Sequence, residues 1–174
     1  MSGTPRVVVR RRSVDAMGEQ MKAPALPEAA RAFVGEWVHL RSEGYAEFLT
    51  ECAGLSWATR KIAERIHPTP TFTLQKKNGE EILVCVTICI GAQPVHEILQ
   101  EGESEFYEPN LNQSYICSSK WEGDKFVATR YDVARGRRSV PTIQSRRVDP
   151  VTDELTIIQD WGGKVPFKSC FMRA

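Results

Sequence analysis

Short strand-like runs follow one another from residue 33 to the end of the chain, about ten in all and roughly ten residues apart. The runs are "FVGEWVHL", "PTFTLQK", "EILVCVTICI", "PVHEILQ", "ESEFYE", "SYICSSKW", "KFVATRYDV", "VPTIQSRRV", "ELTIIQDW" and "VPFKSCFMRA". Turn residues separate them, most clearly Lys77-Asn78-Gly79, which is a hairpin signal. This spacing predicts an antiparallel up-and-down meander and excludes a parallel sheet, in which strands alternate with helices.

A meander of this length leaves two unpaired edges unless the sheet closes on itself. A closed sheet of about ten strands encloses more space than its own side chains need to fill, so it has room for a ligand. Polar residues stand in the runs where a packed core requires apolar ones, namely Gln144 or Ser145, Gln159 and Ser169. Because buried polar groups need partners, we expect water or a ligand's head group inside the barrel.

One stretch, from Gly44 to Pro68, shows helical instead of strand periodicity. Its apolar residues fall on two successive helix faces, Tyr45, Phe48, Leu49 and Cys52 on the first and Leu55, Ala58, Ile62 and Ile66 on the second. Ala53-Gly54 separates the helices. Such short helices are marginal alone, so we expect both apolar faces to pack on the barrel and the pair to cover its open end.

Charge and cysteine content narrow the class of protein. The 23 Lys and Arg residues nearly balance the 22 Asp and Glu residues, so no overall field favours nucleic acid or acidic membranes. The five cysteines are odd in number and lack metal-site spacing, and His39, His67 and His96 are scattered. We interpret the cysteines as reduced core residues of a cytoplasmic protein and the histidines as surface or core polar residues.

The N-terminal segment differs from the rest in composition. It has four arginines among its first twelve residues and no apolar segment long enough for a secretory signal. We expect residues 1–30 to form a flexible basic arm and residues 31–174 to form the β-barrel domain. A second basic segment, Ala134 to Thr142, is expected to be a solvated loop. The alternative for both segments is electrostatic contact with an anionic membrane or a protein partner.

Several segments carry a resemblance to a known family. They are "FVGEW" for an opening Phe-x-Gly-x-Trp, "WATRKIA" for a second lid helix, "HPTPTFT" for the start of the second strand, "KWEGDKF" for a hairpin near the middle, and the closing "FMRA". The chain from Phe33 to Ala174 thus resembles the intracellular lipid-binding proteins, which comprise cytosolic fatty-acid-binding and cellular retinoid-binding proteins. The resemblance implies a mainly β, calycin-like fold: an antiparallel up-and-down barrel of about ten strands with a helix-turn-helix lid between the first two.

The resemblance also implies positions for the ligand's head group. In acid-binding members of the family, an inward Arg-x-Tyr on the last strand holds the ligand's carboxylate. Ser169 and Phe171 stand at those positions here, so the charged donor and the phenol are absent. A second inward arginine of the family matches Arg146. A register shift of one residue would turn Arg147 inward instead.

Three more residues complete the expected ligand contacts. Arg130 is a further candidate for an inward cation, Tyr45 lies on the first helix, and Trp57 stands where the family has its portal. We expect Phe33 and Trp37 to pack in the core instead.

The function implied is non-catalytic binding and transport of a hydrophobic ligand, such as a long-chain fatty acid or related lipid. We expect no enzyme activity, because no acid-base pair can be assembled from the sequence, and no cofactor, metal site or nucleic-acid partner. We expect a monomer in the cytoplasm, with the nucleus as a further location. The alternative is a barrel repurposed as an interaction or signalling module, which uses the basic arm and the Arg-rich loop and binds lipid weakly or differently.

Overall fold

The computed structural model describes residues 25–51, 56–135, 140–162 and 165–174, and these form a ten-stranded antiparallel sheet. The strands are β1 (Gly35–Glu43), β2 (Thr69–Lys77), β3 (Glu80–Ile88), β4 (Val95–Leu99), β5 (Gly102–Glu108), β6 (Gln113–Glu122), β7 (Lys125–Asp132), β8 (Thr142–Asp149), β9 (Glu154–Trp161) and β10 (Phe167–Arg173). A 3-10 helix, η1 (Glu28–Phe33), precedes β1, and the helices α1 (Tyr45–Glu51) and α2 (Trp57–Ala63) lie between β1 and β2.

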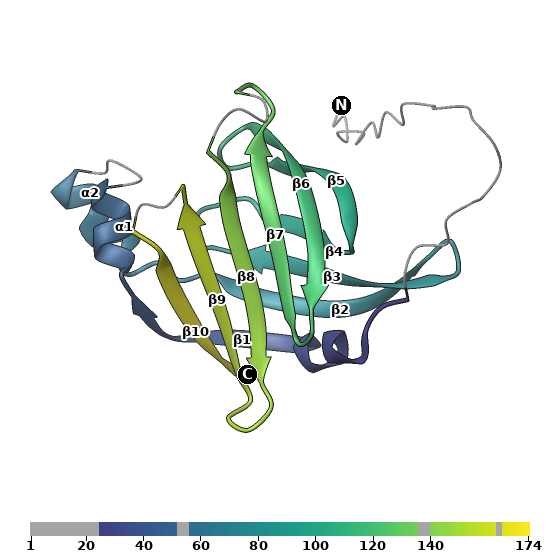
Figure 1. Ribbon diagram of the computed structural model, residues 1–174. Helices are drawn as coiled ribbons and strands as arrows, with labels where there is room; N and C mark the ends of the chain where they lie inside the picture. Colours follow the sequence, from purple (N-terminus) through teal and green to yellow (C-terminus); the bar gives the residue numbers. More distant parts are fainter. Residues whose placement is uncertain (1–24, 52–55, 136–139, 163–164) are drawn as a thin grey trace, which may run out of the picture.

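The strands follow the predicted meander. The sheet order is β4-β3-β2-β1-β10-β9-β8-β7-β6-β5, so β10 pairs with β1 and the sheet curls into a near-closed barrel (Figure 1). Asn78 and Gly79 form the turn between β2 and β3, both with positive φ, at 54° and 83°. The fold class predicted from the sequence is therefore confirmed.

The opening Phe-x-Gly-x-Trp segment packs one end of the barrel. Phe33 ends η1 and is fully buried, with its ring 5.5 Å from Phe72 and 5.6 Å from Trp121. Trp37 is also fully buried, and its indole N–H donates to the Phe33 carbonyl at 2.8 Å. Gly35 has φ of +139°, and a Cβ there would lie 2.8 Å from Arg173 Nη1.

This segment confirms one prediction and corrects another. Phe33 and Trp37 are core residues, as expected. The first strand, however, begins at Gly35 and not at Phe33, because the chain from Glu28 to Phe33 turns into η1 to bury Ala30 and Phe33.

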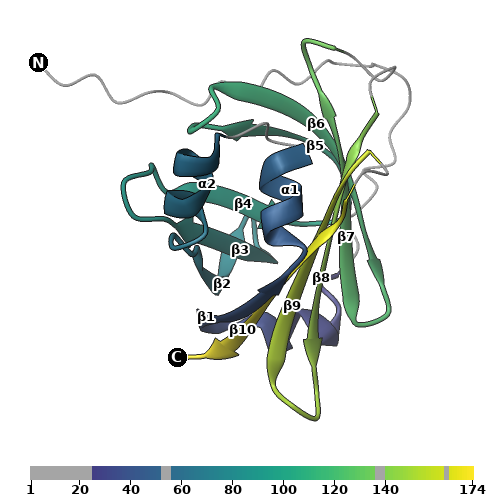
Figure 2. The same ribbon diagram turned by 90° about the vertical axis from the view of Figure 1, so that its left-hand side faces the viewer.

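The helices α1 and α2 lie across the other end of the barrel (Figure 2). On α1, Phe48 and Leu49 are buried, and the Phe48 ring lies 4.4 Å from Phe167 of β10. On α2, Trp57 is 68% exposed and Ile62 is 63% exposed. The expectation that both apolar faces pack on the barrel therefore holds for α1. On the second predicted face, Ala58 and Ile62 are exposed, Ile66 is half-buried, and Leu55 lies outside the described residues.

Two predictions from composition fall largely on residues outside the described ranges. They concern the basic arm, of which only residues 25–30 are described, and the Arg-rich loop, of which residues 136–139 are not. The expected domain boundary at residue 30 lies within η1 and stays a prediction. No helix among the described residues has both the length and the apolar character needed to cross a membrane.

Candidate functional site

A cavity of about 170 Å³ lies inside the barrel, between the packed end and the helices. In the sheet order, its walls come from β2, β3 and β4 on one side of β1 and from β5 and β7 to β10 on the other. It is lined by Pro68, Pro70, Cys85, Thr87, Val95, Glu97, Phe106, Glu108, Arg130, Gln144, Arg146, Ile157, Gln159, Phe167, Ser169 and Phe171. Four of the six predicted ligand contacts are among them, and so are the polar residues Gln144, Gln159 and Ser169 that the sequence placed inside.

The register of β8 decides between two neighbouring arginines. Gln144, Arg146 and Val148 are buried, whereas Arg147 is exposed and forms an ion pair with Asp124 at 2.8 Å. Alternation along a strand sends successive side chains to opposite faces of the sheet. Arg146, which is 5% exposed, is therefore the inward arginine of this strand.

Arg146 belongs to a cluster of interior charges. Glu97 of β4 forms an ion pair with Arg130 of β7 at 2.5 Å and a second one with Arg146. The Gln144 side-chain oxygen accepts hydrogen bonds from Arg130 at 3.0 Å and from Arg146 at 2.5 Å. The Arg130 guanidinium also lies 4.7 Å from the centre of the Phe106 ring. Three strands thus hold two cations around one carboxylate.

This cluster leaves donors without acceptors. Burial by itself would raise the pKa of the Glu97 carboxyl, but the charges of Arg130 and Arg146 and their hydrogen bonds outweigh it and lower the pKa to about 2. Glu97 is therefore ionised at neutral pH. In the part of the chain that the structure describes, Arg130 Nε, Arg146 Nε and Arg146 Nη1 are buried and have no hydrogen-bond partner. Such groups favour a ligand that brings an acceptor oxygen.

The other two predicted contacts lie on the helices and do not line the cavity. The Tyr45 ring is 5.2 Å from that of Phe167, a cavity residue, and burial raises the pKa of the Tyr45 hydroxyl. Trp57 points into solvent on α2. The structure thus brings Arg130, Arg146, Ser169 and Phe171 together in the cavity wall. Tyr45 contacts this wall through Phe167, and Trp57 does not line the cavity.

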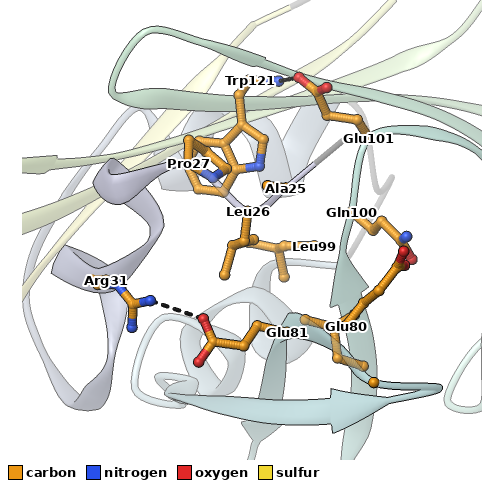
Figure 3. A pocket seen from close by; sticks show the side chains of 12 residues that line it. Ala25, Leu26, Pro27, Arg31, Glu80, Glu81, Leu99, Gln100, Glu101 and Trp121 are labelled. Atoms are coloured by element: carbon orange, nitrogen blue, oxygen red, sulfur yellow. Dashed lines mark hydrogen bonds and ion pairs between the residues drawn. The ribbon is translucent and has the colours of Figure 1, made fainter. Parts of the chain in front are cut away.

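A second hollow, of about 370 Å³, lies beside η1 at the packed end (Figure 3). Leu26, Leu99 and Trp121 line it together with several charged residues. Three of these already have partners, because Glu81 pairs with Arg31 at 2.8 Å and Glu101 accepts a hydrogen bond from the Trp121 backbone N–H at 2.9 Å. None of the predicted contacts lines this hollow, so we place the candidate site in the interior cavity.

Comparison with known proteins identifies the fold through solved structures but finds no match at the level of sequence families. No protein-family model matches the chain, and no curated protein sequence matches it. Solved structures do match. The extracellular fatty acid binding protein As-p18 is 16% identical, with 87% of this chain and 100% of that chain covered and a TM-score of 0.69. The fatty acid binding protein of Schistosoma mansoni, in complex with arachidonic acid, is 20% identical, with coverages of 84% and 98% and a TM-score of 0.64.

Lipid binding protein 8 of Caenorhabditis elegans is a third match, 17% identical over 83% of this chain and 96% of that one, with a TM-score of 0.65. This chain has the fold of the fatty-acid-binding proteins. At these identities the likeness establishes the architecture, and the ligand has to be argued from the site itself.

In this fatty-acid-binding-protein fold, a chain of polar groups leads from the cavity to the outside. The Ser169 hydroxyl lies 3.1 Å from that of Ser42, which in turn lies 2.8 Å from His39 Nε2. The His39 ring stacks on His67 with centroids 3.8 Å apart. This pairing could not be predicted from the sequence, because His39 and His67 are 28 positions apart and meet only where β1 passes the start of β2.

Acidification is expected to destabilise the protein through His39. Burial and the charge of His67 lower the pKa of His39 below its usual 6.5, so the unfolded state binds the proton more tightly. This contribution to stability is complete above pH 6.5 and is lost as the pH falls below it. The melting temperature should therefore fall less between pH 7.5 and 5.5 in His39→Gln than in wild type. Exposed His96→Gln is the control, and equal slopes in all three proteins would contradict the assignment.

Glu97 is the site residue that sequence reasoning missed. A signal for it exists, because Val95, Glu97 and Leu99 alternate with outward His96 and Ile98. A carboxylate in phase with the inward residues of a strand indicates a charge inside the barrel.

Proposed function

We propose that this chain binds and carries a hydrophobic ligand, a long-chain fatty acid or a related lipid, without catalysing a reaction. The observation that supports it best is the pair of buried guanidinium groups of Arg130 and Arg146. Both line the interior cavity and have N–H groups without hydrogen-bond partners. They would hold the ligand's polar head, and apolar residues such as Phe106, Ile157 and Phe171 would contact its chain. The described cysteines are unpaired, which favours a location inside the cell.

The volume of the cavity implies a movement of the helices. About 170 Å³ is less than the roughly 300–1,000 Å³ of common small-molecule pockets. A long lipid chain therefore needs more room than this conformation offers. We propose that α1 and α2 move outward when the ligand enters, since Trp57 and Ile62 of α2 are exposed and contribute little to holding this helix in its present position.

Titration with a panel of lipids tests the proposal. Wild type, Arg146→Leu and Arg147→Leu are titrated with fluorescent lipids, and co-purifying lipids are identified by mass spectrometry. We expect Arg146→Leu to weaken binding by about ten-fold or more and Arg147→Leu to leave it unchanged, because Arg146 lines the cavity and Arg147 does not. Absence of lipid binding by folded wild type would refute the proposal.

The exposed apolar residues of α2 are expected to govern transfer more than affinity. Trp57→Ala and Ile62→Ala should slow transfer of a bound fluorescent lipid to vesicles by about three-fold or more, because they remove apolar surface that can touch a membrane. Each should change the free energy of unfolding by less than about 0.5 kcal/mol, since both side chains face solvent. Stopped-flow fluorescence measures the transfer rate, equilibrium titration with lipid measures the affinity, and denaturant titration measures the free energy of unfolding.

The matched control for this pair is Val151→Ala, an exposed residue in the turn between β8 and β9. Unaltered transfer in both α2 variants, or unfolding of either one, would mean that α2 is not a portal element.

A further inference from the structure

The charges that line the cavity already balance. Arg130 and Arg146 contribute two positive charges, and Glu97 and Glu108 contribute two negative ones. Glu97 contacts both guanidiniums directly, whereas Glu108 accepts hydrogen bonds from Asn110. The protein therefore supplies its own counter-ion at the place where the ligand's head group would bind.

A ligand carboxylate would have to share these arginines with Glu97. Its oxygens would accept hydrogen bonds from the unpaired N–H groups of Arg146 and Arg130, which belong to the same guanidinium groups that Glu97 already contacts. Two carboxylates so close to one another repel, and each disfavours ionisation of the other. Because the side chains of Glu97, Arg130 and Arg146 are only 13%, 14% and 5% exposed, the repulsion is screened less than at the surface.

A neutral oxygen meets the same donors at lower cost. An ester or amide carbonyl, or an alcohol oxygen, can accept a hydrogen bond from Arg146 Nη1 without adding a charge to the cavity. Its desolvation also costs less than that of an ionised carboxylate.

We propose that Glu97 is a built-in counter-ion that makes this cavity select lipids with a neutral acceptor head group, an ester, amide or alcohol, over ionised fatty acids. This inference rests on the proposed function, because it requires that a lipid binds in the interior cavity. It assigns specificity to a residue of β4 that contacts both cavity arginines.

Competition at fixed chain length tests the inference. Nile red, a neutral probe, is displaced at pH 7.5 by oleic acid, oleyl alcohol or methyl oleate from wild type and from Glu97→Gln. In wild type, the alcohol and the ester should bind about ten-fold or more tighter than the acid. In Glu97→Gln, affinity for the acid should rise by about ten-fold while that for the alcohol changes little, because the amide keeps an acceptor oxygen and removes the charge. Glu105→Gln, on an exposed position of β5, is the matched control.

The outcomes separate this inference from the function on which it rests. Equal or tighter binding of the acid by wild type would overturn the inference and leave lipid binding in place. Failure of all three lipids to bind wild type would overturn both. A Glu97→Gln protein that folds and still disfavours the acid would also overturn the role of Glu97. The wild-type comparison stands even if that variant does not fold.

Discussion

Replacing Glu97 with leucine is expected to lower the free energy of unfolding by about 3–5 kcal/mol, because Arg130 and Arg146 would both lose their ionic partner in the interior. Arg146→Leu should cost less, since it leaves the Arg130–Glu97 pair in place. The double variant Glu97→Leu with Arg146→Leu should be more stable than Glu97→Leu alone, because only one buried cation then lacks a partner. Chemical denaturation of the three variants measures these differences.

An exposed ion pair provides the control for this series. Asp124→Ala breaks the pair with Arg147, in which both side chains are about half exposed, and should cost less than about 1 kcal/mol. If Glu97→Leu costs no more than Asp124→Ala, the interior cluster does not hold β4 against β7 and β8.

Replacing Phe33 with alanine is expected to lower the free energy of unfolding by a similar amount, about 3–5 kcal/mol. The ring is fully buried against Phe72 and Trp121, so its removal leaves a cavity at the packed end of the barrel. Phe33 does not line the ligand cavity, so lipid affinity of the folded variant should stay close to that of wild type.

The neighbouring residue Val34 is the control for Phe33. It is 36% exposed, and Val34→Ala should change the free energy of unfolding by about 0.5 kcal/mol or less. Denaturant titration gives both values. A Phe33→Ala protein as stable as Val34→Ala, or one that is stable but no longer binds lipid, would contradict the division between a packed end and a ligand end.

Local sequence signals were enough to predict the strands. Apolar and polar residues alternate in most runs, the run "EILVCVTICI" is rich in β-branched residues, and turn residues such as Asn78-Gly79 mark where hairpins close. The meander could therefore be derived without knowing any long-range contact. The family resemblance made Arg146 the candidate for the inward arginine but left Arg147 as the alternative, and the register of β8 turns Arg146 inward.

Contacts across the barrel could not be derived in this way. Glu97 lies on β4, at one end of the sheet order, and meets Arg130 and Arg146 of β7 and β8 only because the sheet curls. Alternation tells which face a side chain occupies but not which residue it meets on the facing wall. Helical periodicity likewise predicted an apolar face for α2, but not that Ile62 would remain exposed.

Blocking the cavity from within tests the central claim, that lipid binds inside this barrel, most directly. Thr87 of β3 lines the cavity, and its neighbour Ile88 is 52% exposed on the outer face. Thr87→Phe adds a ring inside and Ile88→Phe adds one outside. We expect calorimetric titration with oleyl alcohol to show an affinity about ten-fold or more lower for Thr87→Phe and an unchanged affinity for Ile88→Phe. Unchanged binding by a folded Thr87→Phe protein would place the lipid outside the barrel and contradict the account.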